Sequence, residues 1–65
     1  MPLVRISLWK GRPPEDKEKI AKAVTEALVE SAQVPAEAVT LLIEEESKEN
    51  WFTAGEPHSV RFQDR

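Results

Sequence analysis

The first nine residues, Met1-Pro2-Leu3-Val4-Arg5-Ile6-Ser7-Leu8-Trp9, decide how the rest of the chain is interpreted. Apolar side chains recur at every second position, which predicts a strand over residues 3–9. One face of this strand is wholly apolar and suits a packed helix: Val4, Ile6 and Leu8. The other face carries Arg5 and Ser7 between Leu3 and Trp9, and this mixture predicts burial against another subunit.

Proline directly after the initiator methionine can have a chemical role as well as a structural one. Methionine is usually removed before a small side chain, and its removal would leave Pro2 as a free secondary amine. An ordinary α-amino group titrates near about 8, and burial or a nearby cation lowers that pKa. Pro2 would then be a general base at neutral pH. The alternative is that Pro2 only begins a strand, a position where proline is tolerated.

The next two elements complete a βαβ pattern. Gly11 permits a bend, and Pro14 suits the first turn of a helix that the apolar spacing predicts over residues 14–32. A second strand is predicted over residues 39–44, with Val39, Leu41 and Ile43 on one face. About thirty residues separate the two strands, which predicts parallel pairing with a right-handed crossover.

The last third of the chain carries weaker signals. The acidic run Glu44–Glu49 is interpreted as a solvated turn that leaves the sheet, and not as a metal site. Two aromatics, Trp51 and Phe52, are expected to cover a pocket or a neighbouring subunit. Residues 56–62 are expected to form a short extended tail segment, in which His58 is a solvated side chain.

Composition limits the classes of function. The 65 residues form one domain, residues 1–65, with no cysteine and a net charge of −3. Scattered basic residues argue against nucleic acid, and no apolar run spans a membrane, so a soluble, cytoplasmic protein is expected. A single βαβ unit of this size leaves both sheet edges open. We therefore expect an α/β fold with parallel strands that is completed by oligomerisation.

Together these features resemble a small subunit of the 4-oxalocrotonate tautomerase family. The resemblance rests on Pro2 after Met1, a first strand ending in Leu8-Trp9-Lys10-Gly11-Arg12, one helix, Pro35 before a second strand, and the later Glu45, Lys48, Trp51 and Gly55-Glu56. It covers roughly residues 2–61. It implies a tautomerase-like fold, usually assembled as a homohexamer that is a trimer of dimers.

The resemblance also implies a cofactor-free activity. Pro2 would move a proton in an unsaturated 2-hydroxy acid, such as 2-hydroxymuconate or an arylenolpyruvate, in an aromatic catabolic pathway. Arg12 would hold a substrate carboxylate, often across a subunit boundary, with Leu8 and Trp51 as pocket walls. The alternatives to these binding roles are that Arg12 is an ordinary surface arginine and that Trp51 packs at a subunit interface.

Two positions depart from the family pattern: Trp51 stands where phenylalanine is more usual, and a second departure bears on the chemistry. The family's strand-two arginine falls on Thr40, whose neutral hydroxyl stabilises an oxyanion less than a cation does. Either Arg61 or Arg5 replaces that charge, or the substrate carries one carboxylate. The sequence also fits a non-catalytic or heteromeric subunit, or a related Pro2-dependent decarboxylase or hydratase.

Overall fold

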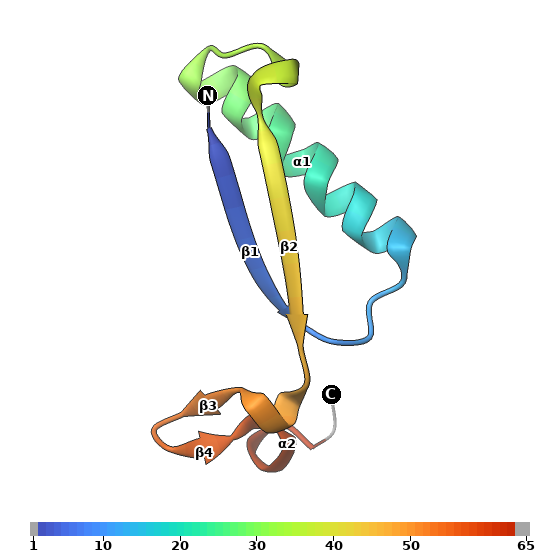
Figure 1. Cartoon of the computed structure of the whole chain (residues 1–65), viewed down its shortest axis with the longest axis vertical. Helices are drawn as coiled ribbons and strands as arrows, with labels where there is room; N and C mark the ends of the chain where they lie inside the picture. The colour runs from blue at the N-terminus through green and yellow to red at the C-terminus, as the bar shows by residue number, and fades with distance from the viewer. Residues whose placement is uncertain (1, 64–65) are drawn as a thin grey trace.

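The computed structural model describes residues 2–63 of the chain. A two-stranded sheet with one long helix forms the upper part of the molecule in Figure 1, and a small C-terminal segment lies beyond the ends of the strands. The elements in order are β1 (Leu3–Trp9), α1 (Pro14–Ala32), the 3-10 turn η1 (Ala36–Ala38), β2 (Thr40–Glu46), the 3-10 turn η2 (Lys48–Asn50), β3 (Phe52–Thr53), β4 (Glu56–Pro57) and α2 (His58–Arg61).

Strands β1 and β2 pair in parallel, as the sequence predicts. Their register runs without a break from Leu3 opposite Thr40 to Trp9 opposite Glu46. Parallel neighbours need a crossover connection, and α1 supplies it. The expected βαβ unit is therefore confirmed.

Helix α1 begins and ends where the sequence signals place it. Pro13 and Pro14 provide a fixed backbone at its start, where no side chain caps the helix, and Glu15 and Asp16 occupy the positive end of the helix dipole. The helix ends at Gln33, whose left-handed φ of 55° reverses the chain.

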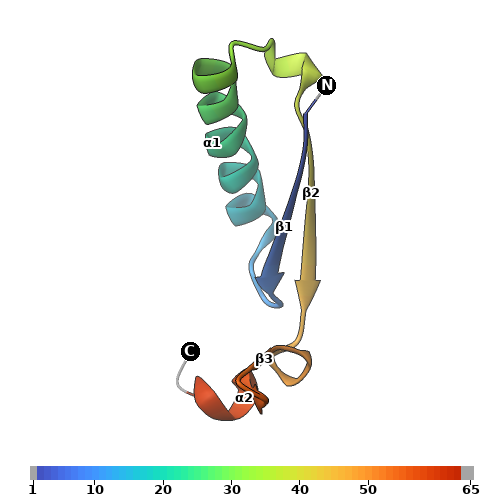
Figure 2. The same ribbon diagram turned by 90° about the vertical axis from the view of Figure 1, so that its left-hand side faces the viewer.

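The helix covers one face of the sheet and leaves the other bare (Figure 2). Exposure alternates along β1, with Val4 and Ile6 half-buried under α1 and Leu3 and Arg5 exposed. On β2 the same alternation leaves Leu42 at 45% exposure. The apolar residues on the uncovered face have no partner within the chain.

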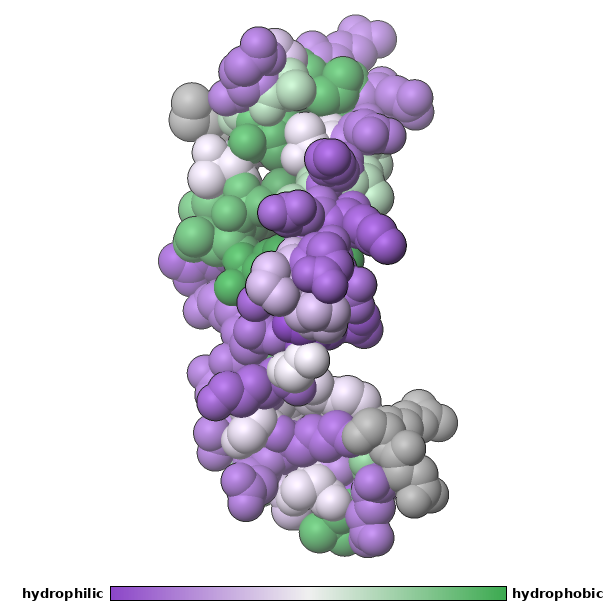
Figure 3. Space-filling view, turned by 90° about the vertical axis from the view of Figure 1, so that its right-hand side faces the viewer, coloured by the Kyte–Doolittle hydropathy of each residue, from purple (hydrophilic) through white to green (hydrophobic). Residues whose placement is uncertain are grey.

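One protomer does not close a hydrophobic core. Among residues 2–63 no apolar side chain is buried, and hydrophobic atoms reach the surface in the upper part of Figure 3. The radius of gyration is 14.7 Å. A compact 65-residue domain would have a radius of about 11 Å. The exposed apolar face and the extended shape are those of a subunit that needs a partner surface.

Two sequence predictions for the C-terminal third are wrong. The acidic run does not leave the sheet at Glu44, because β2 continues through Glu46. The tail is not an extended segment: β3 and β4 form a hairpin that turns at Ala54 and Gly55, and the chain then enters the short helix α2. Positive φ angles at both turn residues, 53° and 80°, match the twist of a two-residue hairpin.

No helix among residues 2–63 is long and apolar enough to cross a membrane.

Candidate functional site

The residues that the sequence singled out lie in two groups at opposite ends of β1. Pro2 precedes the strand, and its carbonyl accepts a hydrogen bond of 3.1 Å from the Thr40 N–H. Pro2 and Thr40 are therefore neighbours at the start of the sheet. Removal of Met1 concerns a residue that lies outside the described part of the chain.

The second group lines an open pocket of about 420 Å³ beyond the other end of the strands. Three of the predicted site residues contribute to its wall: Leu8, Arg12 and Trp51. The remaining lining residues are Ser7, Trp9, Lys10, Gly11, Lys48 and His58. The seven residues of β1 span roughly 23 Å between Pro2 and the bend that carries Arg12, so one chain does not bring these two residues together.

The pocket is positively charged in a chain that is negative overall. Its charged lining residues are Lys10, Arg12 and Lys48, and no acidic residue of the described chain lines it. Arg12 lies 3.9 Å from Asp16 in an exposed pair, a contact that contributes little. The arrangement suits a small organic anion.

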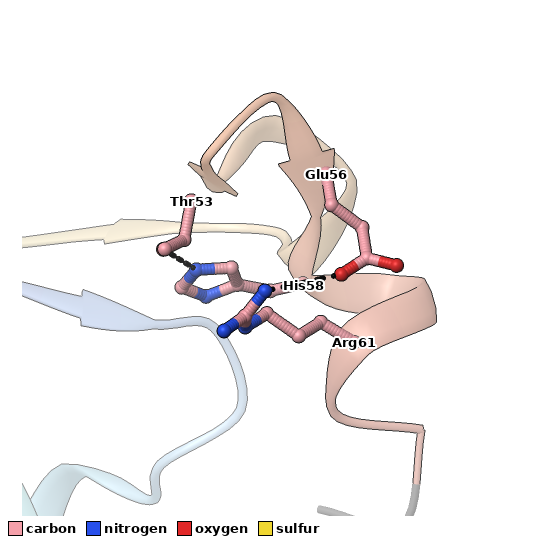
Figure 4. Close-up of polar contacts among 4 residues, drawn as sticks. All are labelled: Thr53, Glu56, His58 and Arg61. Carbon is pink, nitrogen blue, oxygen red and sulfur yellow. Dashed lines mark hydrogen bonds and ion pairs between the residues drawn. The ribbon is translucent and has the colours of Figure 1, made fainter.

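His58 is the centre of the pocket's aromatic wall. It is 8% exposed and is the only buried residue among residues 2–63, so its interpretation as a solvated tail residue is wrong. The Trp9 indole N–H donates to His58 Nδ1 at 2.9 Å, and His58 Nε2 lies 2.8 Å from the Thr53 hydroxyl (Figure 4). Because an indole only donates, the neutral ring carries its proton on Nε2.

Three aromatic rings pack around that imidazole. Trp9 and Phe62 meet it edge-on, at centroid distances of 5.5 and 4.9 Å, and Trp51 lies tilted at 5.6 Å. The aromatic cluster joins the end of β1 to the C-terminal segment. Trp51 Nε1 is buried and has no hydrogen-bond partner among the described residues.

Glu45 joins the second strand to the first helix, next to the bend that carries Arg12. Its Oε1 accepts a hydrogen bond of 3.0 Å from Lys17 Nζ, which ties β2 to the first turns of α1. Lys17 lowers the pKa of Glu45 chiefly through this bond, and the backbone amides of Gly11 and Arg12 add to the effect, while partial burial opposes it. The carboxylate of Glu45 therefore stays ionised at neutral pH and links β2 to α1, while its Oε2 is buried without a hydrogen-bond partner among the described residues.

The two arginines considered as replacements for a strand-two cation lie elsewhere in the protomer. Arg61 pairs with Glu56 at 3.2 Å on the exposed side of α2, as Figure 4 shows, and does not line the pocket. Arg5 lies in the middle of β1 on the uncovered face. Residues 2–63 contain no cluster of three or more side chains able to hold a metal ion.

Comparison with known proteins identifies the family. A family model described as "Tautomerase enzyme" matches residues 2–61. The chain belongs to the tautomerase family. This tautomerase is 43% identical over 56 residues to a probable tautomerase of Streptococcus pneumoniae, an alignment that covers 86% of the chain and 93% of the relative. It is 40% identical over 55 residues to the 2-hydroxymuconate tautomerase of Comamonas testosteroni, covering 85% and 87%.

Solved structures give the same result for this tautomerase. TomN, a 4-oxalocrotonate tautomerase homologue in the tomaymycin biosynthetic pathway, is 35% identical, with a TM-score of 0.91 and 97% of each chain covered. The heterohexamer 4-oxalocrotonate tautomerase of Chloroflexus aurantiacus is 32% identical, with a TM-score of 0.86, covering 91% of this chain and 95% of that one. The resemblance to 4-oxalocrotonate tautomerases inferred from the sequence is confirmed.

Proposed function

We propose that this tautomerase ketonises an unsaturated 2-hydroxy acid without a cofactor, with 2-hydroxymuconate or an arylenolpyruvate as the substrate class. Family membership and the relatives named 2-hydroxymuconate tautomerase support this reaction. The cationic, aromatic-walled pocket supports a flat organic anion as the substrate.

In the proposed mechanism, Pro2 is the base after Met1 has been removed. The neutral amine takes the proton of the enol hydroxyl, and the O–H electron pair forms the carbonyl. The conjugated double bonds shift, and the same proton returns from Pro2 to carbon, so atoms and charge balance. A guanidinium beside the amine disfavours its protonated form and keeps the base available.

The observation that carries this proposal is the separation of the two groups of residues along β1. Pro2 and Thr40 lie at one end of the sheet, and Leu8, Arg12 and Trp51 lie at the other. A site that contains both groups needs a second protomer, and the uncovered sheet face offers a surface for one. We propose that copies of the chain assemble, as a homohexamer, so that the pocket of one protomer meets Pro2 of another.

Within that site each residue has a distinct role. Arg12 binds a substrate carboxylate by a charge-assisted hydrogen bond. Leu8 and Trp51 exclude water, and Thr40 offers a hydroxyl beside Pro2. Arg61 is engaged by Glu56 in its own chain, so the carboxylate is assigned to Arg12.

The experiment combines intact mass with a spectroscopic assay. Preparations that lack methionine should ketonise 2-hydroxymuconate and phenylenolpyruvate, followed by ultraviolet absorbance, and Pro2→Ala should abolish the reaction. Arg12→Ala should raise KM, whereas Lys19→Ala, an exposed change on α1, serves as the matched control. Activity that survives Pro2→Ala, or in a preparation that retains Met1, would defeat the assignment.

A second candidate is a heteromeric subunit. Thr40 in place of an arginine, and a relative described as a heterohexamer, favour it. Native mass spectrometry separates the two candidates: a homohexamer with ketonisation activity supports the enzyme, and an inactive lower assembly that gains activity only with another chain supports the subunit.

A further inference from the structure

Lys48 is a cation that neutral groups hold in place at the pocket wall. Its Nζ donates a hydrogen bond of 3.0 Å to the Phe62 carbonyl and lies 4.6 Å from the centroid of the Trp9 ring. Its side chain is half-buried, and it makes no ion pair among residues 2–63. The ammonium charge is therefore positioned but not neutralised.

The other cations differ from Lys48 in this respect. Arg12 has Asp16 within 3.9 Å, and the side chain of Lys10 is exposed, with only its backbone N–H bonded, to Glu46. A donor that is already ordered loses less freedom when an anion binds than a mobile one does. Of the three positive side chains at the pocket, Lys48 is the one best prepared to receive an anion.

We propose that Lys48 is a second anion-binding residue of the site, and that it and Arg12 hold the same carboxylate of the substrate. Both side chains line one small pocket, and an ammonium retains two further N–H donors after its bond to Phe62. Trp9 and Trp51 form the flat walls of that pocket, which fit a conjugated carbon chain beside the carboxylate. The inference rests on the proposed function only for the identity of the substrate.

This pairing changes how the neutral residue at position 40 is understood. Within one protomer, Lys48 adds its positive charge to the pocket that contains Arg12, at the opposite end of the sheet from Thr40. Anion recognition is concentrated in that pocket. One carboxylate, seated on Arg12 and Lys48, is then sufficient for binding, and a second carboxylate adds little.

Two unreactive acids test the proposal directly. trans,trans-Muconate is a conjugated dicarboxylate, and sorbate is its monocarboxylate counterpart of equal length; neither carries the hydroxyl needed for ketonisation. Binding of each is followed by tryptophan fluorescence and calorimetry for the wild-type protein, Lys48→Gln, Lys48→Arg and the control Lys19→Gln. Glutamine can keep a bond to the Phe62 carbonyl but carries no charge, so Lys48→Gln separates charge from packing.

We expect Lys48→Gln to weaken both acids about tenfold, the loss of one charge-assisted hydrogen bond. Lys48→Arg should stay within about threefold of wild type, and Lys19→Gln should bind normally. Unchanged affinity in Lys48→Gln, a loss confined to muconate, or no binding by the wild-type protein would overturn the proposal. Neither acid can be ketonised, so a failure of the base mechanism would leave this binding result standing.

Discussion

Replacing His58 by phenylalanine tests whether the aromatic cluster is held by its polar contacts. Phenylalanine keeps a ring at the centre of the cluster but cannot accept the Trp9 indole N–H, now bonded at 2.9 Å. Leaving a buried donor without a partner costs about 1–3 kcal/mol. The Thr53 hydroxyl is on an exposed residue and can turn to water, so it adds little. We therefore expect His58→Phe to lower the free energy of unfolding by about 2 kcal/mol.

The assay is urea unfolding followed by circular dichroism and by tryptophan fluorescence, with all variants at one protomer concentration because assembly affects apparent stability. Trp9→Phe and the double variant complete a thermodynamic cycle. With the donor removed, His58→Phe should cost clearly less, giving a coupling of about 1 kcal/mol or more. If the losses in unfolding free energy from His58→Phe and Trp9→Phe were simply additive, the reasoning would be refuted. Thr53→Val should lower the unfolding free energy less than either of these substitutions.

Three further predictions concern the bend, the sheet face and the base end of the site. Lys17 lowers the pKa of Glu45 below its ordinary value of 4.5, so the ionised carboxylate stabilises the native chain above pH 4.5, and this stabilisation is lost as the pH falls through the lowered pKa. Thermal melts of wild type and Glu45→Gln should therefore differ at pH 7 and converge once the pH is below that lowered pKa, and a difference that stays constant with pH would contradict this. Leu42→Asp, on the uncovered face, should dissociate the assembly in sedimentation, whereas Lys19→Asp on α1 should not. Thr40→Arg should raise kcat/KM for 2-hydroxymuconate relative to phenylenolpyruvate, and an unchanged ratio would place residue 40 away from the substrate.

The elements that depend on local pattern could be predicted from the sequence. The spacing of apolar residues and Pro14 predicted the bounds of α1, and alternation predicted which face of β1 the helix covers. The incomplete core followed from the chain length and the single βαβ unit, and it is visible in the exposure of Leu42. These properties are set by neighbouring residues, so a single sequence contains them.

The properties that depend on distant contacts could not be predicted. His58 is buried because Trp9, 49 positions earlier, donates to it, and no local signal reports that pairing. The composition of the acidic run predicted a solvated turn. The run instead continues strand β2, where side chains alternate between the two faces, so Glu45 points inward to Lys17 and Glu46 is exposed. Continuing the alternation of β2 through the acidic run would have placed Glu45 on the inward face and indicated that it needs a positively charged partner.

The positions of the site residues also divide into those that the local sequence pattern predicts and those that depend on distant contacts. Leu8, Arg12 and Trp51 gather in one pocket, although 38 residues lie between the last two. Pro2 lies at the far end of β1, which the strand length already implied. The positive charge of Lys48 at that pocket could not be foreseen, because it depends on where η2 brings the chain back past Trp9.

The length of β1 has a consequence for mixtures of two variants that each lack one site residue. In the proposed assembly, the secondary amine of Pro2 before β1 and the guanidinium of Arg12 past its end belong to different composite centres. Co-refolding equal amounts of a Pro2→Ala chain, which is inactive alone, and an Arg12→Ala chain, whose KM is raised, should give wild-type kinetics at about one quarter of the centres by random assortment. A strand that served a single centre within its own protomer would restore none.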